Sequence, residues 1–302
     1  MYNKIKMHWP SILLYMCSSF MIVIFNKIVL TVFGFSSVPF IMFCQSIFTC
    51  AVFLMRRDHI QKPGKDIILL CLFNTTNIFF GISSAGALNV AMFTALRRIS
   101  IFMTMIAQYY FLNIEIKKPV FWSVVVMIGG SLIAAANDLT FDVKGYTYIM
   151  INNMLTTGVQ IQTKKTIGQK WTKATVLFWS SGLTFLLSGL QLIHFNPKTF
   201  DAWNQTSFQV AFLFSMILGF FINYGATWTI EKNDALTLAV AGSTKSAIMG
   251  LVVCAGLFDP TYKFSWWNFI GLQISAVASF VYVYYAKRKK TEKKIITKTP
   301  PV

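Results

Sequence analysis

The stretch SILLYMCSSFMIVIFNKIVL, from Ser11 to Leu30, decides the fold class of this chain. It contains no acidic side chain and one cation, Lys27. A helix of about 20 apolar residues crosses the roughly 30 Å of hydrocarbon in a bilayer. The stretch follows Lys4 and Lys6, but it is longer than the apolar region of a signal peptide and lacks a cleavage pattern. We therefore interpret it as a membrane span.

Similar apolar runs recur along the whole chain. Of its 302 residues, 55% are hydrophobic and 12% are charged, which is too little charge to cover a soluble domain of this size. The break after the third run, SSAGALNVAM, carries no charge, but one helix across it would be far too long for a bilayer. The sequence predicts an all-α polytopic membrane protein with ten transmembrane helices, at about 10–33, 37–55, 66–85, 90–112, 118–137, 145–163, 174–194, 207–229, 235–257 and 265–286.

The basic residues predict how these spans are oriented. When Lys and Arg are assigned to alternate sides, 20 fall on one side and three, Lys144, Lys198 and Lys263, on the other. Such a bias places both termini in the cytosol and supports an even number of spans. We expect one transport domain over 1–286 and a basic cytosolic tail over 287–302. The net charge of +17 therefore reflects membrane topology, and nucleic-acid binding is excluded because the aromatic residues lie within the spans.

Ten spans divide into halves of five, at about 1–140 and 141–286. An odd number of helices per half makes the halves run in opposite directions, as in the inverted repeats of secondary transporters, whose binding site lies near the midplane. The fourth and ninth helices are equivalent in such a repeat. They carry Arg97, Arg98 and Lys245.

These three cations and Lys27 lie inside apolar spans, whereas the ten acidic residues fall in the polar breaks or the tail. A charge at the centre of a bilayer costs about 2.5–3.5 kcal/mol even on a mild insertion scale. The missing negative charge is expected to come from a ligand, so the sequence predicts a protein that handles an anion within the membrane. No metal site or catalytic group is formed by the five cysteines, the three histidines or the acidic residues. We therefore expect that the protein binds no cofactor and no metal and is not an enzyme.

Four segments resemble the eukaryotic nucleotide-sugar transporters of the drug/metabolite transporter superfamily. They are Ser11–Leu30, MFTALRRIS (Met92–Ser100), INNMLTTGVQIQTKK (Ile151–Lys165) and GSTKSAIMG (Gly242–Gly250). The last three are most similar to the subgroup that carries UDP-glucuronic acid, UDP-N-acetylgalactosamine and UDP-N-acetylglucosamine. The resemblance covers the whole chain in matching order. It implies ten helices, a Golgi or ER membrane, and exchange of a cytosolic nucleotide sugar for a luminal nucleoside monophosphate.

Two departures bear on the choice of base. Guanine-type carriers have GALNK in the ninth helix, whereas Gly242–Ser246 reads GSTKS here, with the lysine one place earlier. The same carriers have FYNN in the seventh helix, whereas Phe178–Ser181 reads FWSS, which lacks the paired amides that read guanine. GDP-mannose is therefore disfavoured, and Trp179 is kept as a candidate substrate contact.

Lys245 is the first candidate for binding the diphosphate. It lies too deep in its helix to reach the membrane surface easily. Gly242, Ser246 and Gly250 form a small-residue stripe that allows close approach of a ligand or a helix, and Ser243 and Thr244 flank the lysine. Arg97 and Arg98 point about 100° apart, so we expect one to bind phosphate and the other to reach the luminal surface.

The remaining candidates have two readings each. Lys27 either contacts substrate or reaches the luminal surface. Asn152 and Asn153 either read the base or sugar hydroxyls, or tie helices together. Tyr15 either stacks on the base or packs among the many other aromatic residues.

The sequence thus predicts an antiporter that exchanges a UDP-sugar for UMP, because the product anion can return through the same cationic site. The alternatives are a carrier of another phosphorylated anion (a GDP-sugar, triose phosphate or phosphoenolpyruvate), an intramembrane enzyme acting on lipid-linked sugar phosphates, and a regulator that does not transport. The oligomeric state, including a homodimer, stays open, as do the sugar and the glycosylation of Asn204.

Overall fold

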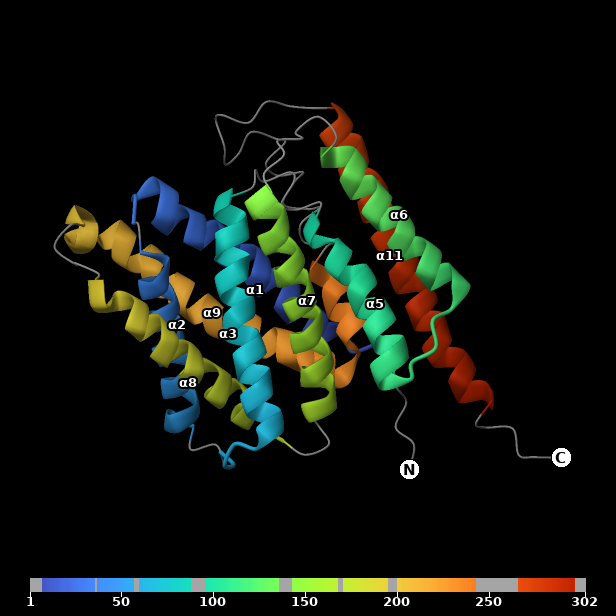
Figure 1. Cartoon of the computed structure of the whole chain (residues 1–302), viewed down its shortest axis with the longest axis horizontal. Helices are drawn as coiled ribbons and strands as arrows, with labels where there is room; N and C mark the ends of the chain where they lie inside the picture. The colour runs from blue at the N-terminus through green and yellow to red at the C-terminus, as the bar shows by residue number, and fades with distance from the viewer. Residues whose placement is uncertain are drawn as a thin grey trace. The chain divides into compact units, whose positions relative to one another are not determined.

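The computed structural model describes residues 7–35, 37–56, 60–87, 96–135, 143–167, 171–194, 200–242 and 266–296 (Figure 1). Regular structure in these ranges is helical apart from one isolated bridge, between Ile167 and Trp171. The α-helices are α1 (Trp9–Lys27), α2 (Val38–Met55), α3 (Lys65–Ala87), α5 (Ile99–Leu112), α6 (Lys118–Ala135), α7 (Val143–Thr166), α8 (Lys173–Gln191), α9 (Thr206–Lys232) and α11 (Trp266–Ile296). Residues 235–242 are also helical.

The helices begin and end close to the limits of the predicted spans. Of the described helices, α1, α2, α8 and α9 are long and apolar enough to cross a membrane, and α5, α6 and part of α11 are shorter apolar helices. The all-helical membrane class is confirmed, and the ten-span repeat stays a prediction. The clearest difference is α11, which runs past the predicted end at 286 to Ile296.

Side-chain caps fix several of these boundaries. Ser37 precedes α2, and its Oγ accepts a hydrogen bond from the Phe40 amide at 3.4 Å. Thr172 precedes α8 and accepts from the Thr175 amide at 3.2 Å. Such caps satisfy amides that have no partner within the helix. At the other end of a helix, Asn113 stops α5 with a left-handed φ of 50°.

The chain forms two compact units, and each combines helices from both halves of the sequence. Unit 1 contains α3 from Asn77, α5, α6, α7 up to Ile161, residues 235–242 and α11. Unit 2 contains α1 from Pro10, α2, α3 up to Thr76, the end of α7, α8, and α9 up to Glu231. The helices α3 and α7 therefore contribute to both units.

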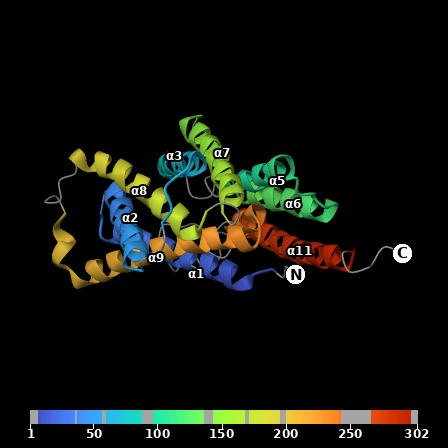
Figure 2. The ribbon, with the colours of Figure 1, turned by 90° about the horizontal axis from the view of Figure 1, so that it is seen from below.

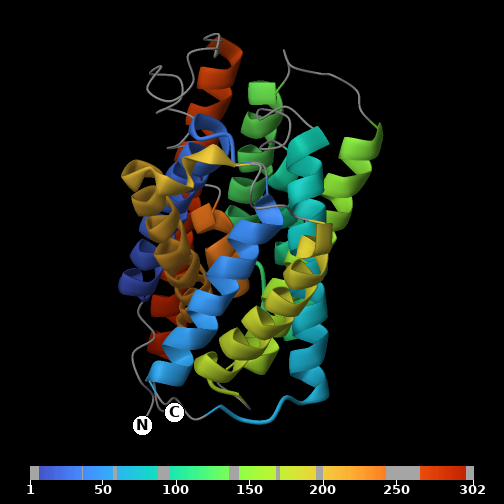
Figure 3. The same ribbon diagram turned by 90° about the vertical axis from the view of Figure 1, so that its left-hand side faces the viewer.

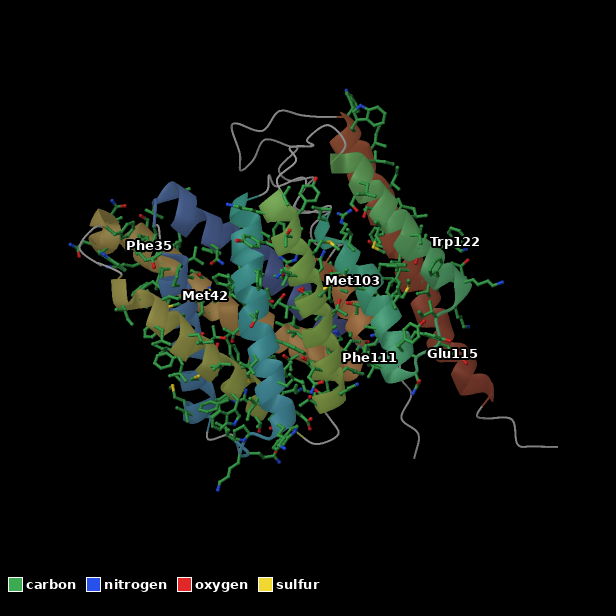
Figure 4. The ribbon with its side chains drawn as sticks, in the orientation of Figure 1. Phe35, Met42, Met103, Phe111, Glu115 and Trp122 are labelled. Atoms are coloured by element: carbon green, nitrogen blue, oxygen red, sulfur yellow. The ribbon has the colours of Figure 1, made fainter. Side chains whose placement is uncertain are left out.

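In unit 1, α6 packs along α11 (Figure 1), and α5 lies beside α6 (Figure 2). Their buried side chains form one core with the helix that begins at Ala235, and this core consists of Ile101, Met105, Val120, Val124, Met127, Leu236, Val240, Ala278 and Tyr282. Trp122 lies on the outer side of α6 with 61% of its surface exposed (Figure 4). An exposed tryptophan on a transmembrane helix suits a face that meets lipid.

Replacing Gly130 by alanine is expected to destabilise unit 1 by about 1–3 kcal/mol, because a Cβ there clashes with backbone atoms of α11, which cannot move away as a flexible side chain can. It would lie 2.8 Å from the Gly271 carbonyl oxygen and 2.9 Å from the Ser275 nitrogen. Gly129→Ala is the matched control, since a Cβ there has nothing within 4 Å. The midpoint of thermal unfolding in detergent measures both variants. Equal midpoints would contradict the close crossing of α6 and α11.

In unit 2, α2 packs against α8 (Figure 3), and a cluster of aromatic rings surrounds Phe35. Gly34, with a φ of +68°, precedes Phe35, which is 1% exposed (Figure 4). The rings around Phe35 belong to Phe40, Phe200, Trp203, Phe208 and Phe212. The α1–α2 connection is thus fixed to the start of α9 by buried aromatic area.

Polar groups also join helices within unit 2. Gln45 on α2 donates to the Ser215 carbonyl oxygen and hydroxyl at 3.2 and 3.0 Å, and that hydroxyl donates to Asn26 Oδ1 at 2.6 Å. At the end of α9, Lys164 Nζ donates to the Ile230 carbonyl oxygen at 2.7 Å, which places a cation at the negative end of the helix. These bonds connect α1, α2, α7 and α9.

Candidate functional site

The two adjacent arginines of the predicted phosphate site have different environments in unit 1. Arg97 is exposed, whereas Arg98 is 3% exposed. Both stand where the chain enters α5, and Arg98 directly precedes its first residue. Of the pair, Arg98 is therefore the buried cation that needs a negative partner.

The Arg98 guanidinium is only partly hydrogen-bonded. Its Nη1 donates to the hydroxyl of Ser275 on α11, which is itself 1% exposed. Among the described residues, Arg98 Nε and Nη2 have no acceptor. Leaving charged donors unpaired in a buried position is costly. On a planar guanidinium, the N–H groups of these two nitrogens suit an oxygen-rich anion such as a phosphate.

The turn that carries these arginines is held at three successive carbonyl groups. The Leu96 oxygen accepts from Asn153 Nδ2 at 2.9 Å. The Arg97 oxygen accepts from Ser100 Oγ at 2.7 Å, and the Arg98 oxygen accepts from the Ile101 amide at 3.0 Å. Asn153 is fully buried, so its donor is used to fix the backbone beside Arg98. This contact is the helix-tying alternative that the sequence left open.

Asn152 makes the same kind of contact with α3. Its Nδ2 donates to the Asn77 carbonyl oxygen at 2.7 Å and to Asn77 Oδ1 at 2.8 Å. Thr156, one turn further along α7, donates to the same Oδ1 at 2.7 Å. Asn152 is 1% exposed. Through their Nδ2 donors both asparagines link α7 to neighbouring segments of unit 1, and each keeps a buried Oδ1 that has no donor among the described residues.

The helix that leads to Lys245 has a well-defined start. Asp234 Oδ1 accepts from the Thr237 amide at 2.7 Å. With its amide oxygen facing the helix, Gln108 on α5 accepts from the Ala235 and Leu236 amides at 2.8 Å each. Gly242 is helical and partly buried. Lys245 and its neighbours Ser243, Thr244 and Ser246 lie outside the described residues, so their placement at the site stays a prediction.

Three other candidates belong to unit 2. Trp179 Nε1 donates to the Gln61 carbonyl oxygen at 3.0 Å, which ties α8 to the α2–α3 connection and leaves the indole without a further donor. The backbone of Tyr15 passes so close to α9 that a Cβ on Gly225 would lie 3.0 Å from it. Lys27 is the last residue of α1, directly before the π-helical segment Ile28–Val32. Substrate contact by these residues stays a prediction.

Asn77, Ser275 and Gln108 take part in this arrangement but were not among the sequence candidates. They are uncharged polar residues in long apolar segments, where a packing role is the ordinary expectation. Of the three, Asn77 had the clearest signal in the sequence, because an amide near the middle of a membrane span needs a hydrogen-bond partner. Over the described ranges, no group of three His, Cys, Asp or Glu side chains could hold a metal ion.

Comparison with known proteins gives matches over almost the whole chain. Residues 9–283 match the model of the Triose-phosphate Transporter family. The UDP-sugar transporter UST74c of Drosophila melanogaster is 35% identical over 93% of this chain and 78% of its own. The UDP-sugar transporter sqv-7 of Caenorhabditis elegans is 35% identical, over 90% and 87%. The nucleotide sugar transporter SLC35D2 of Mus musculus is 31% identical, over 91% and 87%.

One solved crystal structure shares the fold. It aligns with a TM-score of 0.68 and 16% identity, and it covers 92% of this chain and 99% of its own.

Proposed function

Because the chain belongs to the Triose-phosphate Transporter family, we propose that it exchanges a cytosolic UDP-sugar for luminal UMP across a Golgi or ER membrane. The observation that carries the proposal is Arg98, a buried cation with two nitrogens, Nε and Nη2, that lack an acceptor among the described residues. Relatives named as UDP-sugar transporters supply the identity of the anion. Both termini lie in the cytosol, as the distribution of basic residues predicts.

The site works by binding, without a covalent step. Arg98 donates to phosphate oxygens through its planar guanidinium, and Lys245 approaches the same diphosphate as a mobile point charge. Asn153 and Ser275 hold the arginine so that little rotamer entropy is lost when the anion arrives. Gln108 and Asp234 fix the start of the helix that leads to the lysine.

The same cations explain why exchange is favoured over one-way release. An empty site leaves buried like charges without a counter-ion, which is unfavourable in a low-dielectric interior. The site therefore switches between opening to the cytosol and opening to the lumen more readily when an anion fills it. UMP supplies that anion when the site returns from the lumen to the cytosol. A relay of buried acids for proton coupling is not expected, because the acidic residues fall in the polar breaks and the tail.

The test is exchange in proteoliposomes that contain the full chain. Vesicles loaded with UMP are offered labelled UDP-sugars, GDP-mannose, CMP-sialic acid and triose phosphate in turn. We expect uptake of at least one UDP-sugar that depends on internal UMP. Uptake of triose phosphate or GDP-mannose in place of every UDP-sugar would identify another anion carrier. Absence of any uptake by folded protein would favour a regulator.

A further inference from the structure

We propose that Asn77 donates a hydrogen bond to an uncharged part of the nucleotide sugar, through an amide that Asn152 and Thr156 hold in place. The proposal rests on the proposed exchange of nucleotide sugars and adds a substrate contact to it. Three observations on Asn77 carry the proposal: its position on α3, the two hydrogen bonds to its oxygen, and the lack of an acceptor for its nitrogen among the described residues.

Asn77 lies near the middle of α3, which runs from Lys65 to Ala87, and its side chain is partly exposed. At this depth in a bilayer, a primary amide is poorly tolerated against lipid, so polar side chains face protein or a water-filled cavity. The exposed part of the Asn77 amide is therefore expected to face the interior of the transporter.

The orientation of the amide follows from its two donors. Asn152 Nδ2 lies 2.8 Å from Asn77 Oδ1, and Thr156 Oγ1 lies 2.7 Å from the same atom. Both groups donate, so the atom between them must be the oxygen, and the nitrogen must occupy the other branch. Among the described residues, both hydrogen bonds of the Asn77 side chain go to its oxygen, and Nδ2 donates to no partner. Its two N–H groups are therefore available to an acceptor.

The support behind this amide is itself closely packed. Asn152 is 1% exposed, and its second bond goes to the Asn77 carbonyl oxygen at 2.7 Å. A Cβ on Gly81, one turn along α3, would lie 3.0 Å from Asn152 Nδ2, so glycine leaves the room that this side chain needs. A donor that is held before the ligand arrives loses little entropy on binding.

The ligand chemistry follows from the donor. A neutral amide N–H suits a carbonyl or hydroxyl oxygen, whereas the phosphates are better served by cations. In unit 1 the neighbouring residues Asn152 and Asn153 hold Asn77 and the Arg98 turn respectively. The adjacent asparagines are therefore positioning residues, and Asn77 and Arg98 are the groups that meet the substrate. The acceptor is an oxygen of the uracil, the ribose or the transferred sugar.

The test compares Asn77→Leu with Asn74→Leu in the reconstituted exchange assay. Leucine has the same branching as asparagine but cannot form hydrogen bonds through its side chain. We expect Asn77→Leu to raise the KM for the UDP-sugar about ten-fold, the loss of one well-placed hydrogen bond, with a smaller change in maximal rate. Asn74 is the matched control on the same helix, because its Nδ2 already bonds to Ser180 Oγ at 3.0 Å. Asn74→Leu should lower the thermal midpoint and leave KM unchanged.

Competition by UMP and by the UDP-sugar locates the acceptor. A ten-fold loss for both ligands supports a contact with the uridine part, and a loss for the UDP-sugar alone supports a contact with the transferred sugar. If wild-type protein exchanges UDP-sugars and Asn77→Leu keeps the wild-type KM for both ligands, the role of Asn77 is overturned. If wild-type protein exchanges no nucleotide, the proposed function itself fails. Should the leucine variant not fold, Asn77→Ser removes the same amide and is measured in its place.

Discussion

Arg98→Ala is expected to reduce UDP-sugar exchange by about 100-fold or more, whereas Arg97→Ala stays within about three-fold of the wild type. Arg98 is buried, and two of its guanidinium nitrogens lack acceptors among the described residues, while Arg97 is exposed. Initial rates of UMP-dependent uptake in proteoliposomes measure both variants.

Arg98→Lys separates charge from geometry. Lysine keeps the positive charge but cannot offer the planar pair of N–H groups, so we expect partial activity between that of alanine and wild type. Lys118→Ala, at the exposed first residue of α6, controls for the loss of one basic residue. Equal losses in Arg97→Ala and Arg98→Ala would contradict the division of roles, as would normal exchange by a folded Arg98→Ala protein.

Lys245→Ala is expected to abolish exchange, again by about 100-fold or more, and to leave the protein folded and in its membrane. Buried ionisable residues of transporters mark the substrate path, and removing one partner of a desolvated charge pair costs about 2–5 kcal/mol. The helix that leads to Lys245 starts at a defined point, because Gln108 and Asp234 cap it. Uptake assays combined with size-exclusion chromatography in detergent test both parts of this expectation. Wild-type exchange by a folded Lys245→Ala protein would show that Lys245 is not part of the site. It would leave the assignment to the family unchanged.

The hydrophobic pattern predicted the helices well because a span needs about 20 apolar residues to cross the hydrocarbon of a bilayer. Ser11–Leu30 matches α1 and the π-helical segment after it, and the predicted spans at 37–55 and 118–137 match α2 and α6. The end of α11 was missed for a physical reason. Hydropathy falls at 286, but lysine, arginine and glutamate are good helix formers, so the helix continues to Ile296.

The sequence did not predict which helices belong to each of the two units. A division at about residue 140 follows from counting spans, but packing joins α6 to α11 and α2 to α8 across that point. Each pair unites a predicted span with its equivalent in the other half, the fifth with the tenth and the second with the seventh. This pairing suits the predicted inverted repeat, in which equivalent helices share a symmetry axis.

Family membership was predictable from four motifs in order, and the family match confirms it. The roles of single polar residues were not. Helical geometry separates Arg97 from Arg98 by about 100° but cannot say which is buried. Asn153 could have faced a ligand or a neighbouring backbone, and only the fold brings it to the Leu96 carbonyl group. The partners of Asn77 could not be predicted, because Asn152 and Thr156 lie on a distant part of the chain.

The phosphate of the ligand is expected to be the acceptor for the two Arg98 nitrogens that have none among the described residues. The most direct measurement is the dissociation constant of UMP and of uridine for wild-type protein and for Arg98→Gln, by calorimetry in detergent. Wild-type protein is predicted to bind UMP about 10- to 100-fold more tightly than uridine, and Arg98→Gln should lose most of that preference while binding uridine as before. A ratio of UMP to uridine affinity that is the same in both proteins would contradict the account.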